Sequence, residues 1–592
     1  MRKLFYASIV LAAFVLTGCP VDKMAKMAED QQMTITPNPL ELHGDSVAFD
    51  ANVTLPVKML KSNTIYTAKF IYKYGEQEME VGSIDFTLEE YPNADTEPPN
   101  ASASFAFAYT DDMKNGSLDI VGVAKDTRKD KVAESGRLPV AEGVITTSRH
   151  VVEVYYPAYA DHGYNNQEEI LPTNIDFFFD QGRSNLKYSE RRSDRGKAFL
   201  AFIAEKNLTR TVTITGTHSP EGPERINSKL SEDRAGVIEK YYKTQMDKYD
   251  YAGMADSINF VLKPVVDDWS QFKSALAEYD GISDDEKSEY LNIVNGPGVF
   301  EDKEKALQKL GTYRKVFNDL YPGLRSAQTE ILTVKDKKTD AEITVLAAGI
   351  AKGEFSVDTL SVEELLYAAS LTPSLTEKEG IYKAAIKKSD PWNAHASLGA
   401  TYIAMAMENP AKAGEYAGLA ETQVDLANGK NPSACAYITA ASAYLIQGNM
   451  DKAADALDKA AAMNPAGETA NGMKGVRGAI EIRRGNYDEA SSNLSGAVET
   501  ADNLFNKGLA FLLNDDANNA INAFDDAIAL QEDFAMAHYA KAVAYADKDD
   551  VMKLVDSLIK AVKADTSLKG VAINDLEFQA YAANAAFKAA LQ

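Results

Sequence analysis

The sequence predicts a multidomain α+β protein: an N-terminal β-sandwich, a central α/β sandwich with a helical insertion, and a C-terminal all-α solenoid. Three observations predict this class. Short alternating segments fill the chain up to about residue 160, a strand–helix–strand–helix–strand order follows, and the last third is rich in Ala and poor in strands. The length of 592 residues suits three to five domains, and 45% hydrophobic with 25% charged residues excludes disorder as the main state.

Charge and cysteine content exclude several functions. Against 62 Lys and Arg stand 87 Asp and Glu, and a net charge of -25 repels phosphate backbones, so no nucleic-acid partner is expected. The two cysteines, Cys19 and Cys435, cannot make a disulfide scaffold or a Cys-based zinc site. The six histidines are scattered without metal-ligand spacing, and no nucleophile motif or phosphate loop occurs. We therefore predict no catalytic residues, no metal, no cofactor and no enzyme activity.

The first nineteen residues carry a sorting signal. Arg2 and Lys3 precede an apolar stretch over residues 4–16, which is too short for a mature membrane span. The stretch leads into Leu-Thr-Gly-Cys at residues 16–19, a motif that resembles the lipobox of bacterial lipoproteins. The resemblance implies that residues 1–18 are a signal peptide and that Cys19 is acylated, with palmitate among its acyl chains, to become the mature N-terminus.

An acylated Cys19 implies an anchor in outer-membrane lipid. Pro20 follows it, where an Asp would indicate the inner membrane by the same resemblance. We expect the periplasmic face of the outer membrane rather than the cell surface. No other apolar run approaches about 20 residues, so the mature chain is expected not to cross the membrane.

The region before residue 160 has strand character. Residues 19–32 are polar and rich in Met, and we predict a tether there. Residues 33–160 alternate apolar and polar side chains between turn clusters, which predicts a β-sandwich. Strands are expected at residues 46–55, 64–72, 102–109, 117–124 and 150–156. No cluster of His, Asp or Ser marks a site, so a spacer or docking role is favoured over ligand binding.

The middle region has an α/β order with an insertion. Strands are expected at residues 174–180, 211–216, 257–262 and 328–334, and helices at 186–206 and 223–242. The second helix places Asn227, Ser231 and Arg234 on one face. A helical insertion over about residues 265–323 is expected to hold helices at 267–279, 283–294 and 302–320. Its predicted role is to dock a partner.

The residues between the second strand and this helix carry the most specific motif. Gly216, Gly222, Asn227, Leu-Ser-Glu at 230–232 and Arg-Ala at 234–235 resemble the OmpA-like peptidoglycan-binding domain, over residues 168–335. In that family an Asp of the loop and an Arg of the helix hold the diamino acid of the peptidoglycan stem peptide. An acid pairs with its ammonium and an Arg fork with its carboxylate.

The resemblance implies a peptidoglycan site in which one half is altered. Arg234 stands at the family's Arg position, whereas Ser219 stands at the position of the Asp. A hydroxyl supplies no charge, and Glu221 is the hypothetical substitute. The predicted binding residues are Arg234, Asn227, Ser219, Glu221 and Gly216. The alternative is that the fold is kept, wall binding is lost and Arg234 is a surface residue in weak ion pairs.

The last third repeats. After a predicted linker at residues 336–360, residues 361–592 carry Ala453, Ala490, Ala520 and Leu554 at equivalent places, 37, 30 and 34 residues apart. This resembles the tetratricopeptide (TPR) repeat, with its period of about 34 residues. We expect about six units, a terminal cap helix at 575–591 and Cys435 as a small buried residue. Such arrays form solenoids whose concave face binds peptides or proteins, so a protein partner is expected.

Two functions remain open. The first is an outer-membrane lipoprotein scaffold that attaches to peptidoglycan through the OmpA-like domain and binds a protein through the TPR repeats. The second is an accessory scaffold subunit of an outer-membrane assembly or secretion complex, whose OmpA-like domain has lost wall binding.

Overall fold

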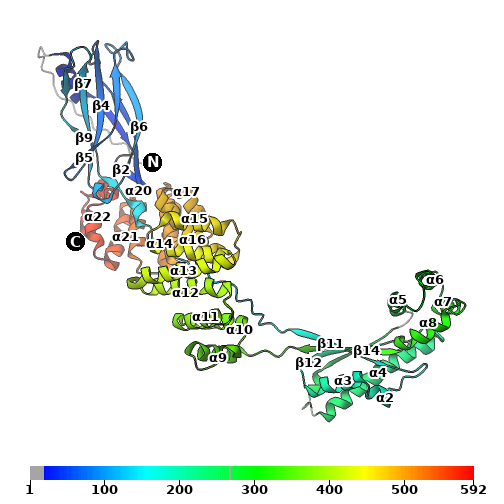
Figure 1. Ribbon diagram of the computed structural model, residues 1–592. Helices are drawn as coiled ribbons and strands as arrows, with labels where there is room; N and C mark the ends of the chain where they lie inside the picture. The colour runs from blue at the N-terminus through cyan, green and yellow to red at the C-terminus, as the bar shows by residue number, and fades with distance from the viewer. Residues whose placement is uncertain (1–18, 250, 252–253, 266–268) are drawn as a thin grey trace. The chain divides into compact units, whose positions relative to one another are not determined.

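The chain forms two compact units. The computed structural model describes residues 19–249, 251, 254–265 and 269–592 (Figure 1). One unit joins the described residues up to Tyr164 with Ile343–Gln592, and the other is formed by residues 165–342. The second unit is therefore inserted into the first, whereas the sequence predicted domains in linear succession. The signal peptide and the lipobox residues before Cys19 lie outside the described residues.

The first unit begins with the expected β-sandwich. One five-stranded sheet holds β1 (Gln32–Thr36), β2 (Leu40–His43), β3 (Ser46–Thr54), β6 (Asn100–Ala108) and β10 (Val144–Ile145). The other holds β4 (Thr64–Tyr74), β5 (Gln77–Thr87), β7 (Ser117–Asp126), β8 (Val132–Glu134) and β9 (Leu138–Glu142). Alternate residues of β3 and β4 are buried, and Phe49 meets Phe70 between the sheets with ring centroids 5.9 Å apart. The strands predicted at 46–55, 64–72, 102–109 and 117–124 are confirmed.

The predicted tether is in fact a packed helix. Helix α1 (Pro20–Met27) and a following 3-10 turn, η1 (Ala28–Asp30), occupy most of residues 19–32. Val21 and Met24 are fully buried against the sandwich core, and Lys131 pairs with Asp22 at 2.6 Å. The prediction was wrong because the apolar residues are few, yet they recur at helical spacing and form one buried stripe.

The strand predicted at residues 150–156 does not form. The sandwich ends at a 3-10 turn, η3 (Thr147–His150), and residues 151–164 continue outside any helix or sheet. Their backbone groups are bonded to helix side chains, as described below, so the alternating pattern reflects burial in a groove rather than sheet pairing.

The second unit is built on a four-stranded sheet in the order β11-β14-β12-β13. Its strands are β11 (Ile170–Phe178), β12 (Thr209–Gly216), β13 (Asn259–Pro264) and β14 (Ser326–Val334), with α2 (Tyr188–Arg191), α3 (Asp194–Ala204) and α4 (Glu224–Lys248) beside them (Figure 1). Strands β12 and β13 are parallel, and the other pairs are antiparallel. The helix predicted at 186–206 is divided at Ser193, whose side chain caps α3.

The insertion has a core of its own. It contains α5 (Ser270–Ala277), α6 (Asp284–Asn295), α7 (Phe300–Leu307), α8 (Tyr313–Asp319) and η5 (Tyr321–Leu324). Phe272, Tyr290 and Tyr321 are nearly or fully buried together. The single helix predicted at 302–320 is two helices, α7 and α8.

The helical array starts earlier than predicted. Residues 336–360 are not a linker throughout, because α9 (Asp340–Lys352) and η6 (Val357–Thr359) occupy most of them. Ile343 and Ala347 are fully buried in the core of the first helices. Six hairpins follow: α10 (Val362–Leu371) with α11 (Leu375–Ser389), α12 (Trp392–Glu408) with α13 (Ala413–Lys430), α14 (Ala434–Ile446) with α15 (Met450–Ala461), α16 (Gly467–Arg484) with α17 (Tyr487–Ser495), α18 (Ala501–Leu513) with α19 (Ala517–Leu530), and α20 (Ala535–Asp547) with α21 (Val551–Ala564).

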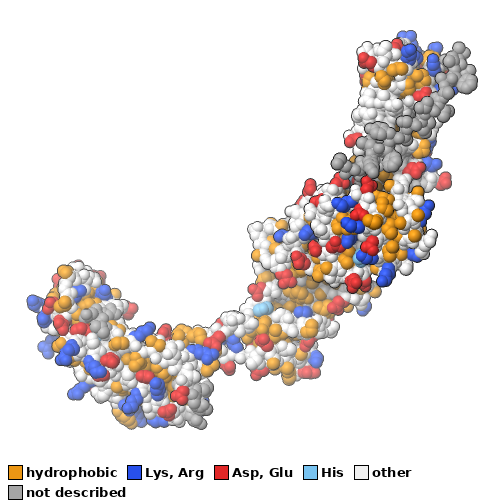
Figure 2. Space-filling view, turned by 180° about the vertical axis from the view of Figure 1, so that it is seen from behind, with side chains coloured by type: hydrophobic (Ala, Val, Ile, Leu, Met, Phe, Trp, Pro, Cys, Tyr) orange, Lys and Arg blue, Asp and Glu red, His pale blue; other side chains and the backbone are white. Residues whose placement is uncertain are grey.

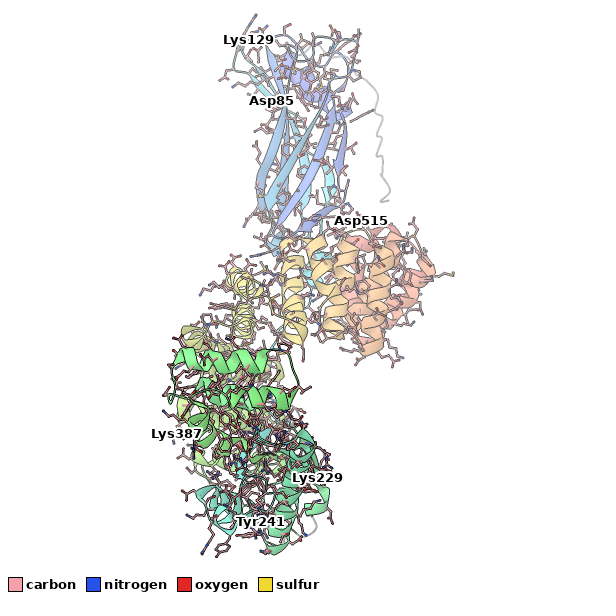
Figure 3. All side chains as sticks on the ribbon, turned by 90° about the vertical axis from the view of Figure 1, so that its right-hand side faces the viewer. Asp85, Lys129, Lys229, Tyr241, Lys387 and Asp515 are labelled. Carbon is pink, nitrogen blue, oxygen red and sulfur yellow. The ribbon has the colours of Figure 1, made fainter. Side chains whose placement is uncertain are left out.

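The hairpin turns explain the repeated Gly-Asn and Asp-Asp pairs. Gly448, Gly485, Asp515 and Asp549 have φ values of 76°, 82°, 59° and 56°, in the left-handed region that ends a helix. In three of the four turns the next side chain, Asn or Asp, caps the second helix. Figure 3 labels Asp515 in the turn between α18 and α19. The period is thus fixed by turn chemistry as well as by apolar residues.

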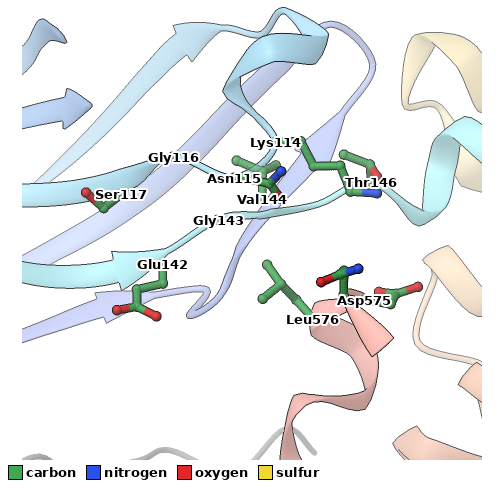
Figure 4. A pocket seen from close by; sticks show the side chains of 11 residues that line it. Lys114, Asn115, Gly116, Ser117, Glu142, Gly143, Val144, Thr146, Asp575 and Leu576 are labelled. Atoms are coloured by element: carbon green, nitrogen blue, oxygen red, sulfur yellow. The ribbon is translucent and has the colours of Figure 1, made fainter. Parts of the chain in front are cut away.

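The sandwich and the array pack together within the first unit. The cap predicted as one helix at 575–591 is broken into η8 (Leu576–Tyr581) and α23 (Ala585–Ala590), after α22 (Leu568–Ile573). Thr147 donates a hydrogen bond to Glu577 at 2.6 Å, and a Cβ on Gly143 would lie 2.7 Å from Leu576. A pocket of about 340 Å³ lies beside this contact (Figure 4). The break in the helix places η8 against the sandwich.

Candidate functional site

The predicted peptidoglycan residues lie around one loop of the second unit. Gly216 ends β12, Ser219 and Glu221 lie in the loop after it, and Asn227 and Arg234 lie on α4. The loop is followed by Pro223, the residue before α4. A Cβ on Gly216 would lie 1.9 Å from the carbonyl oxygen of Ser231, so Gly216 allows α4 to approach the sheet.

Arg234 holds main-chain carbonyls together. Its side chain is 1% exposed, and its Nε, Nη1 and Nη2 donate to the carbonyl oxygens of Arg183, Thr217 and Asp180 at 3.0, 2.6 and 3.2 Å. Its guanidinium also lies over the ring of Phe179, at 5.4 Å. Burial, with a smaller contribution from Arg325, lowers the pKa of Arg234 to about 10. The guanidinium thus ties the loop to the segment after β11.

Glu221 is paired within the chain. Arg325, which precedes β14, donates to Glu221 Oε1 from Nη2 at 2.8 Å and from Nε at 3.1 Å, and to Ser219 Oγ from Nε at 2.9 Å. The side chains of Arg325 and Glu221 are only 9% and 14% exposed. Asn227 donates to the carbonyl oxygens of Glu221 and Gly222 at 3.3 and 3.4 Å, which fixes the loop on α4. The cation beside Glu221 is therefore supplied by the protein.

Arg325 was missed by sequence reasoning. It lies about a hundred residues beyond the loop, across the insertion, and reaches Ser219 because β14 pairs with β12. The pairing continues past the strand ends, where Thr217 N donates to Ser326 O at 2.8 Å. An Arg directly before the last strand was the available signal, but it becomes informative only once the strand order is known.

The insertion covers this loop. The ring of His218 meets that of Phe300 in α7 at 5.6 Å, and the N–H of Glu224 at the start of α4 donates to Glu301 at 2.9 Å. Phe317 of α8 lies 5.6 Å from the Arg325 guanidinium. Residues 217–220 are all buried as a result. The buried part of the loop that was predicted to hold the ligand therefore faces protein.

The inner side of the array is a second candidate site, and it is occupied by the protein's own chain. Three small polar side chains, on the first helices of two hairpins, each bond both backbone groups of one residue in segment 151–164. Asn506 of α18 accepts from Val152 N at 2.9 Å and donates to Val152 O at 2.7 Å. Ser442 of α14 bonds Tyr156 N and O at 2.9 and 3.3 Å. These contacts anchor two points of the segment.

The same pattern continues towards the end of the segment. Thr439 of α14 accepts from Ala158 N and donates to Ala158 O, both at 3.3 Å. Ser397 of α12 accepts from Ala160 N at 3.1 Å. Asn393 Nδ2, also on α12, donates to Asp161 O at 3.0 Å. The segment therefore satisfies its backbone groups with side chains of helices.

A signal for this groove is present in the sequence. Ser397, Thr439, Ser442 and Asn506 are at most 2% exposed on otherwise Ala-rich helices. Buried polar residues of this kind need partners. The Ala and Leu positions that define the repeat do not account for these four polar residues.

Neither cysteine is a fully buried core residue. Cys19 is half-buried at the start of α1 and packs against the sandwich core. Cys435 is also only partly buried, and its Sγ lies 3.3 Å from Ser433 Oγ. Burial raises the pKa of the Cys435 thiol, which lowers its reactivity.

The described residues offer neither a candidate metal site nor a membrane span. No grouping of three or more His, Cys, Asp or Glu side chains suited to a metal occurs among residues 19–592 outside the undescribed positions. In the same part of the chain, no helix has the length and apolar character needed to cross a bilayer.

Known proteins resemble this chain in structure rather than in sequence. No protein-family model matches the chain, and no curated protein sequence matches it. The solved structures that match include TPR-repeat proteins. YrrB, a TPR protein with an unusual peptide-binding site, is 20% identical over 31% of this chain and 92% of its own, with a TM-score of 0.26.

Two further structures are similar over comparable parts. The C-terminal part of a TPR repeat-containing protein from Cytophaga hutchinsonii is 15% identical, covers 39% of this chain and 92% of its own, and has a TM-score of 0.28. PilF of Pseudomonas aeruginosa is 16% identical, with 32% and 96% covered and a TM-score of 0.25. The C-terminal region resembles TPR solenoids, and its own hairpins, with α14, α16, α18 and α20 beginning 33 or 34 residues apart at Ala434, Gly467, Ala501 and Ala535, show the repeat.

Proposed function

We propose that this protein is a non-enzymatic scaffold of the bacterial envelope, an accessory subunit of an outer-membrane assembly or secretion complex. In this proposal its OmpA-like unit is a docking body that does not hold peptidoglycan. The observation that carries the proposal is the loop after β12: residues 217–220 are buried beneath the insertion, and Oε1 of the partly buried Glu221 is already paired to Arg325.

The chemistry of a diamino acid explains why this pairing matters. A free amino-acid end brings an ammonium that needs an unpaired carboxylate, and a carboxylate that needs a free Arg fork. Glu221 Oε1 accepts two hydrogen bonds from Arg325, and Arg234 uses Nε, Nη1 and Nη2 on carbonyl oxygens. A ligand would have to displace both sets of bonds and the aromatic cover above them.

The outer helices of the array support a scaffold role. Large apolar side chains are exposed on the second helices of the hairpins: Leu419 and Leu426 on α13, Leu530 on α19, and Met552 and Ile559 on α21. Figure 2 shows hydrophobic side chains exposed among charged ones over the array. We propose that the protein partner binds through surfaces of this kind.

Cys19 is the proposed membrane anchor. Helix α1 begins at Pro20 and packs on the sandwich, so an acyl group on Cys19 would hold the sandwich directly at the bilayer surface on the periplasmic side. The Cys19→Ser variant is expected to lose incorporation of a palmitate analogue and to leave the membrane fraction. Cys435→Ser should keep both properties, and membrane retention of Cys19→Ser would contradict the anchor.

Attachment to peptidoglycan is the second candidate function, because Arg234 stands at the family's position. Co-sedimentation of the full-length protein with purified peptidoglycan tests it, with a stem-peptide fragment as competitor. We expect the protein to stay in the supernatant. Saturable pelleting that the fragment reverses would overturn the proposed loss of wall binding.

The proposed protein partner is tested separately, in cell envelopes. Affinity purification from detergent-solubilised envelopes, with quantitative mass spectrometry, is expected to recover a membrane-protein partner in stoichiometric amount. Recovery of peptidoglycan-linked material without such a partner would instead support the wall anchor.

A further inference from the structure

We infer that residues 151–164 are a built-in peptide ligand of the helical array, which closes the inner groove to peptides of other proteins. This inference depends on the geometry of the first unit alone, so it can fail or hold independently of the proposed envelope role. Three segment residues, Val152, Tyr156 and Ala158, have both backbone groups bonded by groove side chains. A site that reads backbone groups in this way suits an extended peptide.

Side chains of the segment fit the groove closely. A Cβ on Gly472 of α16 would lie 2.4 Å from the ring of Tyr156, so the groove lacks a side chain where the segment has a large one. Ala158 is 1% exposed in the core formed by α14 and its neighbours. Lys378 lies 5.2 Å from the centre of the Tyr159 ring. The complementarity selects this segment among extended peptides.

The end of the segment is fixed as well. The Tyr164 ring stacks on Tyr367 of α10 at 4.9 Å, and His162 contacts the same ring at 5.1 Å. The segment thus runs from α18 past α14 and α12 to α10. It crosses the inner helices of five successive hairpins, because Tyr156 also lies against α16.

Covalent linkage gives the segment a large advantage. A tethered ligand has an effective concentration of the order of millimolar. An outside peptide of equal affinity at micromolar concentration is therefore expected to occupy roughly one groove in a thousand. Groove binding of a partner would require release of residues 151–164.

The test uses the full-length protein and a fluorescein-labelled synthetic peptide with the sequence of residues 151–164. Ala158→Asp places an unpaired carboxylate in the buried position and should release the segment, while the groove keeps its own side chains. Gln167→Asp adds the same charge at an exposed position and is the matched control. We expect saturable 1:1 peptide binding by Ala158→Asp, at least tenfold tighter than by wild type or Gln167→Asp.

Hydrogen exchange gives the second readout. The amides of Val152, Tyr156 and Ala158 should exchange slowly in wild type and at least tenfold faster in Ala158→Asp. Fast exchange of these amides in wild type, equal peptide binding by wild type and Ala158→Asp, or a released segment without peptide binding would each overturn the inference.

A glycine pair keeps the inference testable if Ala158→Asp fails to fold. Gly472→Ala pushes against Tyr156, whereas Gly418→Ala enters open space on α13. Only Gly472→Ala should accelerate exchange at Tyr156 and Ala158. Equal exchange in the two glycine variants would contradict a fitted groove.

Discussion

At the scale of single residues, position in a motif and role in the fold can differ. Arg234 was predicted to bind a ligand, yet its hydrogen bonds go to three carbonyl oxygens of its own chain. Buried carbonyls without donors cost about 1–3 kcal/mol each. Arg234 therefore contributes to stability whether or not any ligand binds.

Arg234→Ala is expected to destabilise the second unit by about 2 kcal/mol or more, because the buried carbonyl of Thr217 and two partly buried carbonyls lose their donor. Lys229→Ala on the exposed face of α4 removes only surface ion pairs and should change stability by less than about 1 kcal/mol. Chemical unfolding, monitored by hydrogen exchange in α4, measures the stability of both variants. Equal stability of the two variants would contradict a structural role for Arg234. Because Arg234→Ala is expected to be destabilised, its weak retention on peptidoglycan would not by itself show that Arg234 binds the wall.

Glu304 gives the insertion a pH dependence. It is 3% exposed, accepts from Tyr313 and Tyr321, and burial raises the pKa of its carboxyl. The folded state therefore holds this proton more strongly than the unfolded chain, whose Glu titrates near pH ~4.3. The stability that protonation supplies is present at low pH and is lost as pH rises through the folded pKa.

We expect the stability of Glu304→Gln relative to wild type to increase as pH rises from about 4 to 7.5, because the variant cannot ionise. Urea unfolding at several pH values measures the difference. Asp302→Asn, on the exposed side of α7, controls for the loss of one negative charge. A difference that stays constant or falls with pH would contradict the raised pKa.

At the scale of elements, the insertion changes what the α/β sandwich can do. Helix α7 brings Phe300 over His218, and α8 brings Phe317 over Arg325. Residues 217–220 of the loop after β12 are thereby buried, and Glu221 is partly buried.

Phe300→Ala is expected to cost about 3 kcal/mol through the cavity it leaves and to raise hydrogen exchange in residues 217–224. Val299→Ala is the matched control, because the neighbouring Val299 is 61% exposed. Exchange that is unchanged in Phe300→Ala, with a measurable loss of stability, would show that α7 does not cover the loop.

At the scale of the whole molecule, the second unit is an insertion into the first. Tyr164 before it and Ile343 after it pack in the same hydrophobic core, at the start of the array. The two connections therefore leave the first unit near one another, and its sandwich, groove segment and array form one body.

Replacing residues 165–342 with a short Gly-Ser linker should leave the first unit folded, with its thermal transition shifted by no more than a few degrees. Differential scanning calorimetry is expected to show a separate transition in the full-length protein that the shortened chain lacks. Loss of cooperative unfolding in the shortened chain would contradict the independence of the two units.

Local pattern alone identified much of this protein. The alternation of apolar and polar residues predicted β3, β4, β6 and β7. Turn residues and small apolar positions predicted the repeat, and the order of strands and helices predicted the α/β sandwich. Each of these signals depends only on neighbours in sequence. Ser219, Glu221 and Arg234 were also named from a local motif, and their role in peptidoglycan binding stays a prediction. The helix at the start of the chain was missed because it is short, and its stability comes from packing.

Only the tertiary structure decided what these parts face. Arg325 meets Glu221 across a hundred residues, the insertion covers the loop, and residues 151–164 fill the groove of helices that lie some 240 to 350 residues later in the chain. Such contacts are fixed by strand pairing and packing between distant segments, which leave no local period. The sequence by itself thus determined the kinds of domain, and the long-range contacts determined which of their surfaces remain available.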